Sequence, residues 1–402
     1  MNLLIIILAI TILAVRIWKY QTITHFFSQV SPPLPDEIGQ DNDNIQISIL
    51  QPILSGDPTL WSCLSGNLEM VTSYQCEFLW LVDTDDEIGI AGCQELINSY
   101  PDRHIRLLTL PPPPDKISPK TYKLIEGLKQ SQGEYITVLD DDTILPDWAF
   151  EQSLPKIDQP EIGVTFGLPY YLNFSNLWSS LLAAVVNGNS LLTYIPYTYL
   201  IKPITLNGMF FVIKKEILAQ INGFSGLENT LVDDHAIAMR FREYNYQLKQ
   251  SPVCHGISTQ VDNITHYLNI INRWFIFPQA SIMRLGNFQD LLIFYTIVLF
   301  PTCFPLLIFL YTLIFPSIYT LTYSLIYFSF SYWMLAQFNQ NYLNQATPNQ
   351  KIILLIIVQI LLPINIILSL LSPKKINWRG HIMEIKKDGT FTFIQRRNQN
   401  QD

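Results

Sequence analysis

The chain has 402 residues, of which 49% are hydrophobic and only 14% charged, and its formal net charge is −8. This composition is apolar for a soluble protein and predicts membrane segments, while the negative charge argues against a general nucleic-acid-binding function. The five cysteines have neither the spacing of a zinc site nor the even number typical of a disulfide framework. We therefore expect a membrane protein whose main domain faces a reducing compartment, the cytosol.

The N-terminus carries the first apolar segment. Residues 2–15 are almost wholly apolar, and Arg16 and Lys19 follow them. A cleaved signal peptide would place basic residues before the apolar run and a small-residue cleavage site after it. The segment therefore predicts a retained transmembrane anchor over residues 1–20. Because positive flanks stay in the cytosol, we expect a cytosolic linker over residues 21–45.

Residues 46–260 form the predicted main domain, and their first part alternates strand and helix signals. Apolar runs of strand length alternate with helical patterns and end at turn residues or aspartates. Strands that alternate with helices of this length predict a parallel, doubly wound α/β sheet. The predicted strands are 45–54, 76–82, 105–110 and 134–139, and the predicted helices are 59–73, 88–99 and 119–131.

Acidic residues follow two of these strands. Asp83 comes directly after one strand, and Asp140, Asp141 and Asp142 come after another. Open α/β sheets bind ligands at the carboxyl ends of their strands, so we expect the acids of residues 83–87 and of 140–142 to face one crevice.

The motifs that usually hold phosphate through glycines are absent, since the chain has neither GxGxxG nor GxxxxGK[ST]. A divalent cation, Mn²⁺ or Mg²⁺, bound by Asp140 and Asp142 could carry a diphosphate instead. Two alternatives remain for the acidic triplet. It could be a solvated turn, or an aspartate-nucleophile phosphatase motif, although Ile144 stands where that motif needs Thr or Val.

Further apolar segments lie in the second half of the chain. Residues 261–288 predict an amphipathic interfacial segment, and 289–371 predict transmembrane helices. The tail, 372–402, is basic and favours a cytosolic location. Three spans after a cytosolic domain would put it outside, so either the segment kinked at Pro363 is re-entrant or one boundary is wrong. The expected spans are 291–315, 317–335 and 352–371, and the stretch 175–195 predicts either a membrane-facing lip over an acceptor site or a core helix.

An ordered set of motifs over about residues 46–275 resembles family 2-type glycosyltransferases, and most closely their ceramide glucosyltransferase-like membrane group. One departure is Ile270, which replaces the first Gln or Arg of the (Q/R)xxRW motif. The tail segment INWRGHIMEI, 376–385, resembles a WRG segment of membrane glycosyltransferases, for which only a headgroup or interface role suggests itself. The motifs are ISILQPILSGDPTLWSCL, LVDTDDE, SPKTYKL (118–124), VLDDDTILPD, GVTFGLPYY (163–171), NGMFFVIKKEILAQINGF (207–224), LVDDHAIAMR (231–240) and INRW (271–274).

The resemblance implies a GT-A fold with a nucleotide-binding half and an acceptor half. It also implies transfer of a hexose, with glucose expected, from a nucleotide sugar such as a UDP-hexose to a lipid hydroxyl, as in ceramide, with inversion. Asp234 would be the general base. A simpler interpretation of its motif is that the acidic residues only stabilise the N-terminus of a helix. Donor-binding roles would fall to Pro52, Asp83, Lys120, Asp140, Arg273 and Trp274, and metal binding to Asp140 and Asp142.

Other functions stay open at this point. The acceptor could be a carotenoid, a hopanoid or diacylglycerol instead of ceramide. Arg273 and Trp274 could simply belong to an interfacial helix. The chain could also be a non-catalytic membrane protein that binds a nucleotide sugar or a lipid, although the presence of all three acidic motifs argues for an enzyme.

Overall fold

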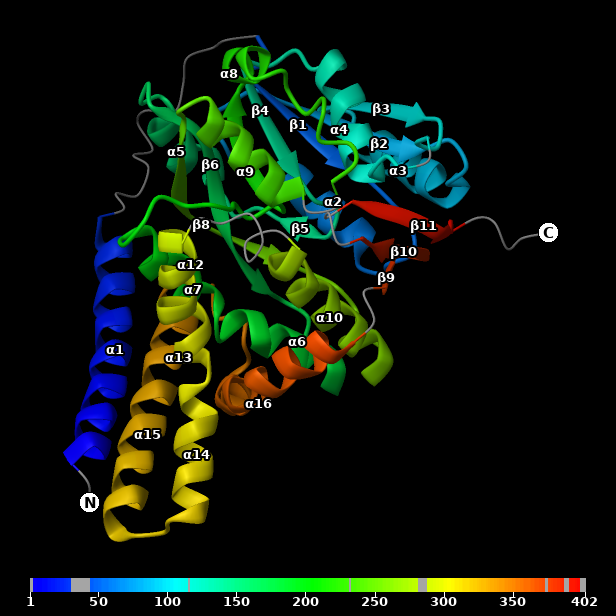
Figure 1. The fold of residues 1–402 in the computed structure, drawn as a ribbon. Coiled ribbons are helices and arrows are strands. Elements are labelled where there is room, and N and C mark those ends of the chain that lie inside the picture. Colours follow the sequence, from blue (N-terminus) through cyan, green and yellow to red (C-terminus); the bar gives the residue numbers. More distant parts are fainter. Residues whose placement is uncertain are drawn as a thin grey trace.

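The protein folds into an α/β domain that adjoins a group of apolar helices (Figure 1). An eight-stranded sheet carries the candidate site, and the C-terminal tail forms a separate three-stranded sheet. Most of the predicted linker and the last five residues lie outside the described part of the chain. The computed structural model describes residues 3–29, 44–114, 116–230, 233–280, 288–372, 375–386 and 390–397.

The first half of the large sheet is parallel, as predicted. Its four strands pair in the order β3-β2-β1-β4, and every pairing among them is parallel. Such strands are covered on both faces, which explains why they appear in the sequence as continuous apolar runs. The strands are β1 (Ile47–Pro52), β2 (Cys76–Asp83), β3 (His104–Leu110) and β4 (Tyr135–Leu139).

The second half of the sheet, for which the sequence pattern predicted no strand direction, is mixed. β7 inserts antiparallel between β4 and β6, and β8 pairs parallel with β6. Apolar periodicity reports burial but not strand direction, so the sequence could not show this. The two halves together make the predicted GT-A architecture. The strands of this half are β5 (Thr143–Ile144), β6 (Ile162–Tyr171), β7 (Phe210–Lys214) and β8 (Gln247–Ile257).

Helices cover both faces of the sheet and enclose two apolar cores. Along β2, Phe78 and Trp80 belong to one core and Leu79 and Leu81 to the other, because successive strand side chains point to opposite faces. The strands are thereby held firmly, and their carboxyl ends are fixed in space. The surrounding helices are α2 (Leu60–Glu69), α3 (Glu87–Ser99), α4 (Pro119–Gln130), α5 (Ala149–Ile157), α8 (Lys215–Gln220) and α9 (Asp233–Glu243).

The apolar helices lie below the sheet in Figure 1. By length and composition, Leu3–Ser28 and Asn349–Leu371 could each cross a membrane, and the bent pair Phe294–Thr302 and Phe304–Ile314 could form a third crossing. These are the candidates among the described residues only. The helices are α1 (Leu3–Ser28), α6 (Leu177–Asn187), α7 (Ser190–Thr198), α10 (Ile264–Ala280), α12 (Phe288–Ile293), the π-helix Phe294–Leu299, α13 (Phe300–Thr302), α14 (Phe304–Ile314), α15 (Ile318–Asn341) and α16 (Ile352–Leu371).

The N-terminal helix differs from its prediction in two respects. It continues to Ser28, eight residues into the expected linker. Arg16 and Lys19 are also only 9% and 6% exposed, so they do not form a solvated flank. Arg16 donates hydrogen bonds to Ser331 Oγ on α15 and to Gln359 Oε1 on α16. Because these charges serve contacts between helices, they no longer support the predicted orientation in the membrane.

The tail folds back onto the α/β domain. Its strands are β9 (Lys375–Trp378), β10 (His381–Ile385) and β11 (Phe391–Gln395), and Arg379 between the first two contacts Asp141 of the large sheet. The domain and the tail must therefore lie on the same side of any membrane. In Figure 1, α16 runs crosswise below α6 and α10, whereas α1, α14 and α15 run side by side. This geometry favours the predicted alternative in which the segment around Pro363 does not cross.

Candidate active site

The candidate site consists of two cavities at the carboxyl edge of the parallel strands. The first has a volume of about 820 Å³ and is lined by charged residues from the loops after β1, β2 and β4 and from the tail. The second has a volume of about 450 Å³, and its apolar lining includes Val185 and Val186 of α6, Tyr194 of α7, and Trp274 and Phe275 of α10. The two share the residues Lys120, Asp140, Tyr171, Met209, Arg273, Trp274 and Trp378.

Asp83 ends β2 and lines the charged cavity. Its Oδ2 accepts a hydrogen bond from Lys123 Nζ of α4 at 2.9 Å. Burial raises the pKa of Asp83, and the lysine opposes that rise. The other oxygen, Oδ1, is buried and has no hydrogen-bond partner among the described residues. An unsatisfied buried acceptor is costly, so this atom is suited to an N–H donor from a ligand.

The acids that follow Asp83 do not share its position. Asp86 caps α3 by accepting from the backbone N–H of Gly89, and it also accepts from Ser55 N–H at 2.8 Å. None of residues 84–87 lines the charged cavity. The prediction that this whole acidic segment faces the crevice is therefore wrong for all but its first residue. The first backbone N–H groups of a helix lack partners within the helix, and the carboxylate of Asp86 accepts a hydrogen bond from one of them. This capping contact explains the position of Asp86.

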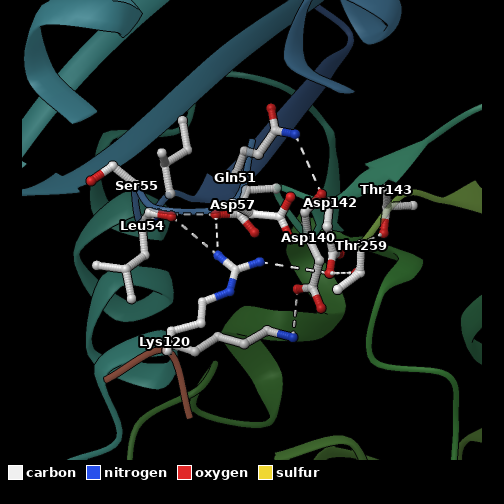
Figure 2. A network of polar contacts seen from close by, with 12 residues as sticks. Gln51, Leu54, Ser55, Asp57, Lys120, Asp140, Asp142, Thr143 and Thr259 are labelled. Carbon is white, nitrogen blue, oxygen red and sulfur yellow. Dashed lines mark hydrogen bonds and ion pairs between the residues drawn. The ribbon is translucent and has the colours of Figure 1, made fainter. Parts of the chain in front are cut away.

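The three aspartates after β4 take different partners, as Figure 2 shows for two of them. Asp140 pairs with Lys120 Nζ at 2.7 Å, and the same lysine donates to the carbonyl of Gly208. Asp142 accepts from Thr259 Oγ1 at 3.2 Å. Asp141, which is 3% exposed, accepts from the backbone N–H of Leu54 at 2.9 Å. All three line the charged cavity.

The donor set suits a cation that arrives with a phosphate ligand. No group of three or more metal-binding side chains occurs among the described residues, but Asp140 and Asp142 both line the cavity. Mg²⁺ and Mn²⁺ sites in phosphate-transferring enzymes commonly use one or two carboxylates and take their other ligands from water and the substrate. Burial raises the pKa of Asp142 to about 6, against the opposing charge of Arg379. A nearby cation would favour the ionised form of this carboxylate.

The remaining predicted donor-side residues also reach the site. Pro52, at the end of β1, lines the charged cavity. Arg273 and Trp274 lie on α10 and line both cavities, and burial lowers the pKa of Arg273. Ile270 lines the charged cavity one turn earlier, so the departure from the (Q/R)xxRW motif leaves an apolar patch on the wall at that point.

Asp234 lies in the first turn of α9 and lines only the apolar cavity. Its Oδ1 accepts from the backbone N–H of His235 at 2.7 Å. A β-carbon built on Gly208 would stand 3.2 Å from the Asp234 Cβ and 3.8 Å from Lys120 Nζ. Gly208 therefore separates Asp234 from the Lys120–Asp140 pair by little more than the width of one methyl group.

The interrupted stretch 175–195 forms part of the wall of the apolar cavity. The break at 187–189 separates α6 from α7, and Asn187 bonds to both the backbone N–H and the carbonyl of Tyr171 at the end of β6. Leu182 and Ala183 are fully buried, whereas Val186 and Ser190 line the cavity. The stretch is therefore core on one face and cavity wall on the other, and its role as a membrane-facing lip over an acceptor site stays a prediction.

Sequence reasoning missed the contribution of the tail. Arg379 donates from Nη1 to Asp141 Oδ2 at 2.5 Å, and its Nη2 lies 3.6 Å from Asp142 Oδ2. Trp378 lines both cavities, and Arg397 lines the charged one. The WRG segment was visible in the sequence, but nothing in its local pattern indicated that it contacts an aspartate 238 residues away.

Comparisons with known proteins place this chain among glycosyltransferases. A poly-beta-1,6-N-acetyl-D-glucosamine synthase of Staphylococcus epidermidis is 25% identical over 142 residues, which are 33% of this chain and 32% of that protein. The chain thus spans about a third of this curated relative's length.

Two solved structures are also similar. One is a mannosyltransferase from Pyrobaculum calidifontis in complex with GDP-Man and Mn²⁺, with a TM-score of 0.44, 12% identity and coverage of 88% of this chain and 98% of that one. The other is GalNAc-T7 with UDP, GalNAc and Mn²⁺, with a TM-score of 0.43, 11% identity and coverage of 60% and 51%. Residues 1–391 match the glycosyl transferase family 21, and the chain belongs to this family and is a glycosyltransferase.

Proposed function

We propose that this protein is a membrane-bound, metal-dependent, inverting hexosyltransferase. It moves a hexose from a nucleotide sugar, with UDP-glucose as the first donor to test, to a hydroxyl group of a lipid at the cytosolic face. The observation that carries this proposal is the meeting of the two cavities at Asp140, Arg273 and Trp274. A charged donor and an apolar acceptor can enter from different sides and react where the cavities join.

The charged cavity suits the nucleotide diphosphate. The unsatisfied Oδ1 of Asp83 would accept an N–H of the base, while Lys123 pairs with the other oxygen, Oδ2. Asp140 and Asp142 would hold Mn²⁺ or Mg²⁺, which supplies positive charge against the diphosphate that leaves. Arg273 would add a fixed cation at the junction, where the bond to the leaving group breaks.

The apolar cavity suits a lipid acceptor. Its walls include Val185, Val186 and Phe275, and the helices that carry them pack against the apolar helices α1 and α16. An acyl or polycyclic chain could therefore pass from the membrane to the junction without crossing water. Ceramide is the first acceptor to test, and a carotenoid, a hopanoid or diacylglycerol would present the same chemistry.

Asp234 would act as the general base. It would remove the proton of the acceptor hydroxyl as that oxygen attacks the anomeric carbon. The bond from this carbon to the diphosphate oxygen would break, and its electron pair would leave with the nucleotide. One in-line displacement inverts the anomeric configuration. A positioned base of this kind typically contributes ~10²–10⁴-fold to the rate.

The test is release of UDP from UDP-glucose by the purified protein in detergent. Release is measured with Mn²⁺ or with EDTA, and with or without a total lipid extract. We expect UDP to be released only when metal and lipid are both present. With the donor labelled in its glucose, the label should appear in a lipid-soluble product of inverted anomeric configuration. Equal release without lipid, or a water-soluble polymeric product, would contradict the proposed acceptor, and full activity in EDTA would contradict the metal.

A further inference from the structure

The C-terminal sheet is a docked structural element with its own small core. Ile376, Met383, Ile385 and Phe391 are buried together and pack against Ile276 of α10, the helix that carries Arg273 and Trp274. In Figure 1 the red strands lie beside α10 and close to the ends of the parallel strands. Apolar burial thus holds the tail at the candidate site.

The polar contacts of this sheet reach the loops that follow three of the parallel strands. After β1, Arg397 donates from Nη1 to the carbonyl of Ser55 at 2.6 Å. After β3, Arg396 donates to the carbonyl of Pro113 at 2.7 Å. After β4, Arg379 contacts Asp141. The sheet therefore covers the carboxyl edge at which open α/β sheets bind their ligands.

Arg379 occupies the turn between β9 and β10 in an unusual backbone conformation. Its φ is 48° and that of Gly380 is 91°, and the left-handed region is unfavourable for a residue with a β-carbon. Asparagine or glycine would fit such a turn with less strain. The contacts of the side chain explain why an arginine stands at this strained position, because its guanidinium lies between Asp141 and Asp142.

The two carboxylates that Arg379 contacts differ in exposure and in partners. Asp141 is almost fully buried and also accepts from Leu54, so this contact anchors the guanidinium. The contact with Asp142 is looser, at 3.6 Å, and Asp142 is the residue expected to bind the metal. A planar guanidinium has five N–H donors and binds phosphate oxygens through two of them at once, so an anchored arginine can still bind a diphosphate.

We propose that Arg379 binds the diphosphate of the nucleotide donor, and that it neutralises Asp142 until the metal and donor enter. This inference rests on the proposed function, because it presumes that the charged cavity holds a nucleotide diphosphate. Asp141 keeps the guanidinium in place throughout, while the arm near Asp142 transfers to phosphate oxygens. The tail thereby becomes part of the donor site, where it contacts the loops that follow β1, β3 and β4.

The test compares Arg379→Ala and Arg379→Lys with Lys375→Ala, which removes an exposed positive charge from the same sheet. Binding of UDP and of uridine is titrated with Mn²⁺ present, and Mn²⁺ binding is titrated alone by paramagnetic resonance. Arg379→Ala should weaken UDP binding by about tenfold or more, because it removes charge-assisted hydrogen bonds. Uridine binding should stay within about twofold of the wild type, since uridine lacks the diphosphate. Mn²⁺ alone should bind as tightly or more tightly, because a competing cation is gone.

Arg379→Lys should give an intermediate loss of UDP binding, because a lysine keeps the charge but not the fork of two donors. Lys375→Ala should match the wild type. A parallel loss of UDP, uridine and Mn²⁺ binding would show a merely structural role, and unchanged UDP binding would also overturn the inference. If the wild-type protein binds neither UDP nor GDP with Mn²⁺, the proposed donor class itself fails. Wild-type UDP binding that Arg379→Ala leaves intact refutes only the role of Arg379.

Discussion

Gly208 offers a direct test of where the reaction takes place. An alanine there would put a methyl carbon 3.2 Å from the Asp234 Cβ, 3.9 Å from its Cγ and 3.8 Å from Lys120 Nζ. Carbon atoms pack best at roughly 3.5–4.0 Å, so only the first contact is too close, by a few tenths of an ångström. Asp234 would have to shift slightly, and the passage between the proposed base and Asp140 would narrow by one methyl group.

A displacement of about 1 Å at a reacting centre can cost about 10²-fold in rate. The shift here is only a few tenths of an ångström, so we expect Gly208→Ala to lower turnover by less than this, about 3- to 10-fold. UDP binding should stay nearly unchanged, since Gly208 lines only the apolar cavity. The assay is initial rate of UDP release with lipid, alongside a UDP titration. Gly66→Ala is the matched control, because its added carbon would lie at an ordinary 3.5 Å from Ile144.

Two results would refute this reasoning. Full activity of Gly208→Ala would mean that the acceptor hydroxyl does not pass between Asp234 and the Lys120–Asp140 pair. A loss of UDP binding as large as the loss of turnover would mean that the substitution disturbs the donor side instead. A large fall in melting temperature would indicate a folding defect, and Gly208→Ser would then be compared at matched stability.

Three further predictions concern single side chains. Asp234→Asn should lower transfer by ~10²–10⁴-fold with UDP binding retained, whereas the exposed Asp102→Asn should be silent; retained turnover would contradict the base assignment. Lys123→Met leaves the buried carboxylate of Asp83 unpaired and should lower the free energy of unfolding by about 3 kcal/mol. Lys129→Met, on the exposed face of the same helix, should lower it by less than about 1 kcal/mol. Equal melting temperatures of the two variants would show that the Lys123–Asp83 pair does not stabilise the fold. Burial lowers the pKa of His255 to about 3. Below pH ~6.5 this histidine is therefore protonated in the unfolded chain but stays neutral in the folded chain. The free energy of unfolding should fall by about 2 kcal/mol between pH 7 and pH 5 for this reason. His255→Leu should remove that part of the acid sensitivity, and an unchanged slope of melting temperature against pH would contradict it.

Much of the fold was visible in the sequence because the information is local. The strand ends before Asp83 and Asp140 follow from apolar runs that stop at an acidic residue, and the alternation with helices predicts that both lie at one edge of a parallel sheet. The structure puts both residues on the wall of one cavity. Long apolar stretches likewise predicted the positions of α1, α14, α15 and α16.

Partners far apart in the chain were decided only by the tertiary structure. Asp86 caps α3 and does not line the charged cavity, and Asp141 is held by an arginine from the tail. Arg16, which looked like a charged flank, is buried against α15 and α16. Periodicity and composition report how much of a segment is buried, but they do not state which distant group satisfies a charge. The sequence alone thus determined the fold class and the edge of the sheet that carries the acidic residues. The packing of the tail and helices decided which of these residues face the cavity, because a buried charge is stable only when a hydrogen-bond or ion-pair partner lies beside it.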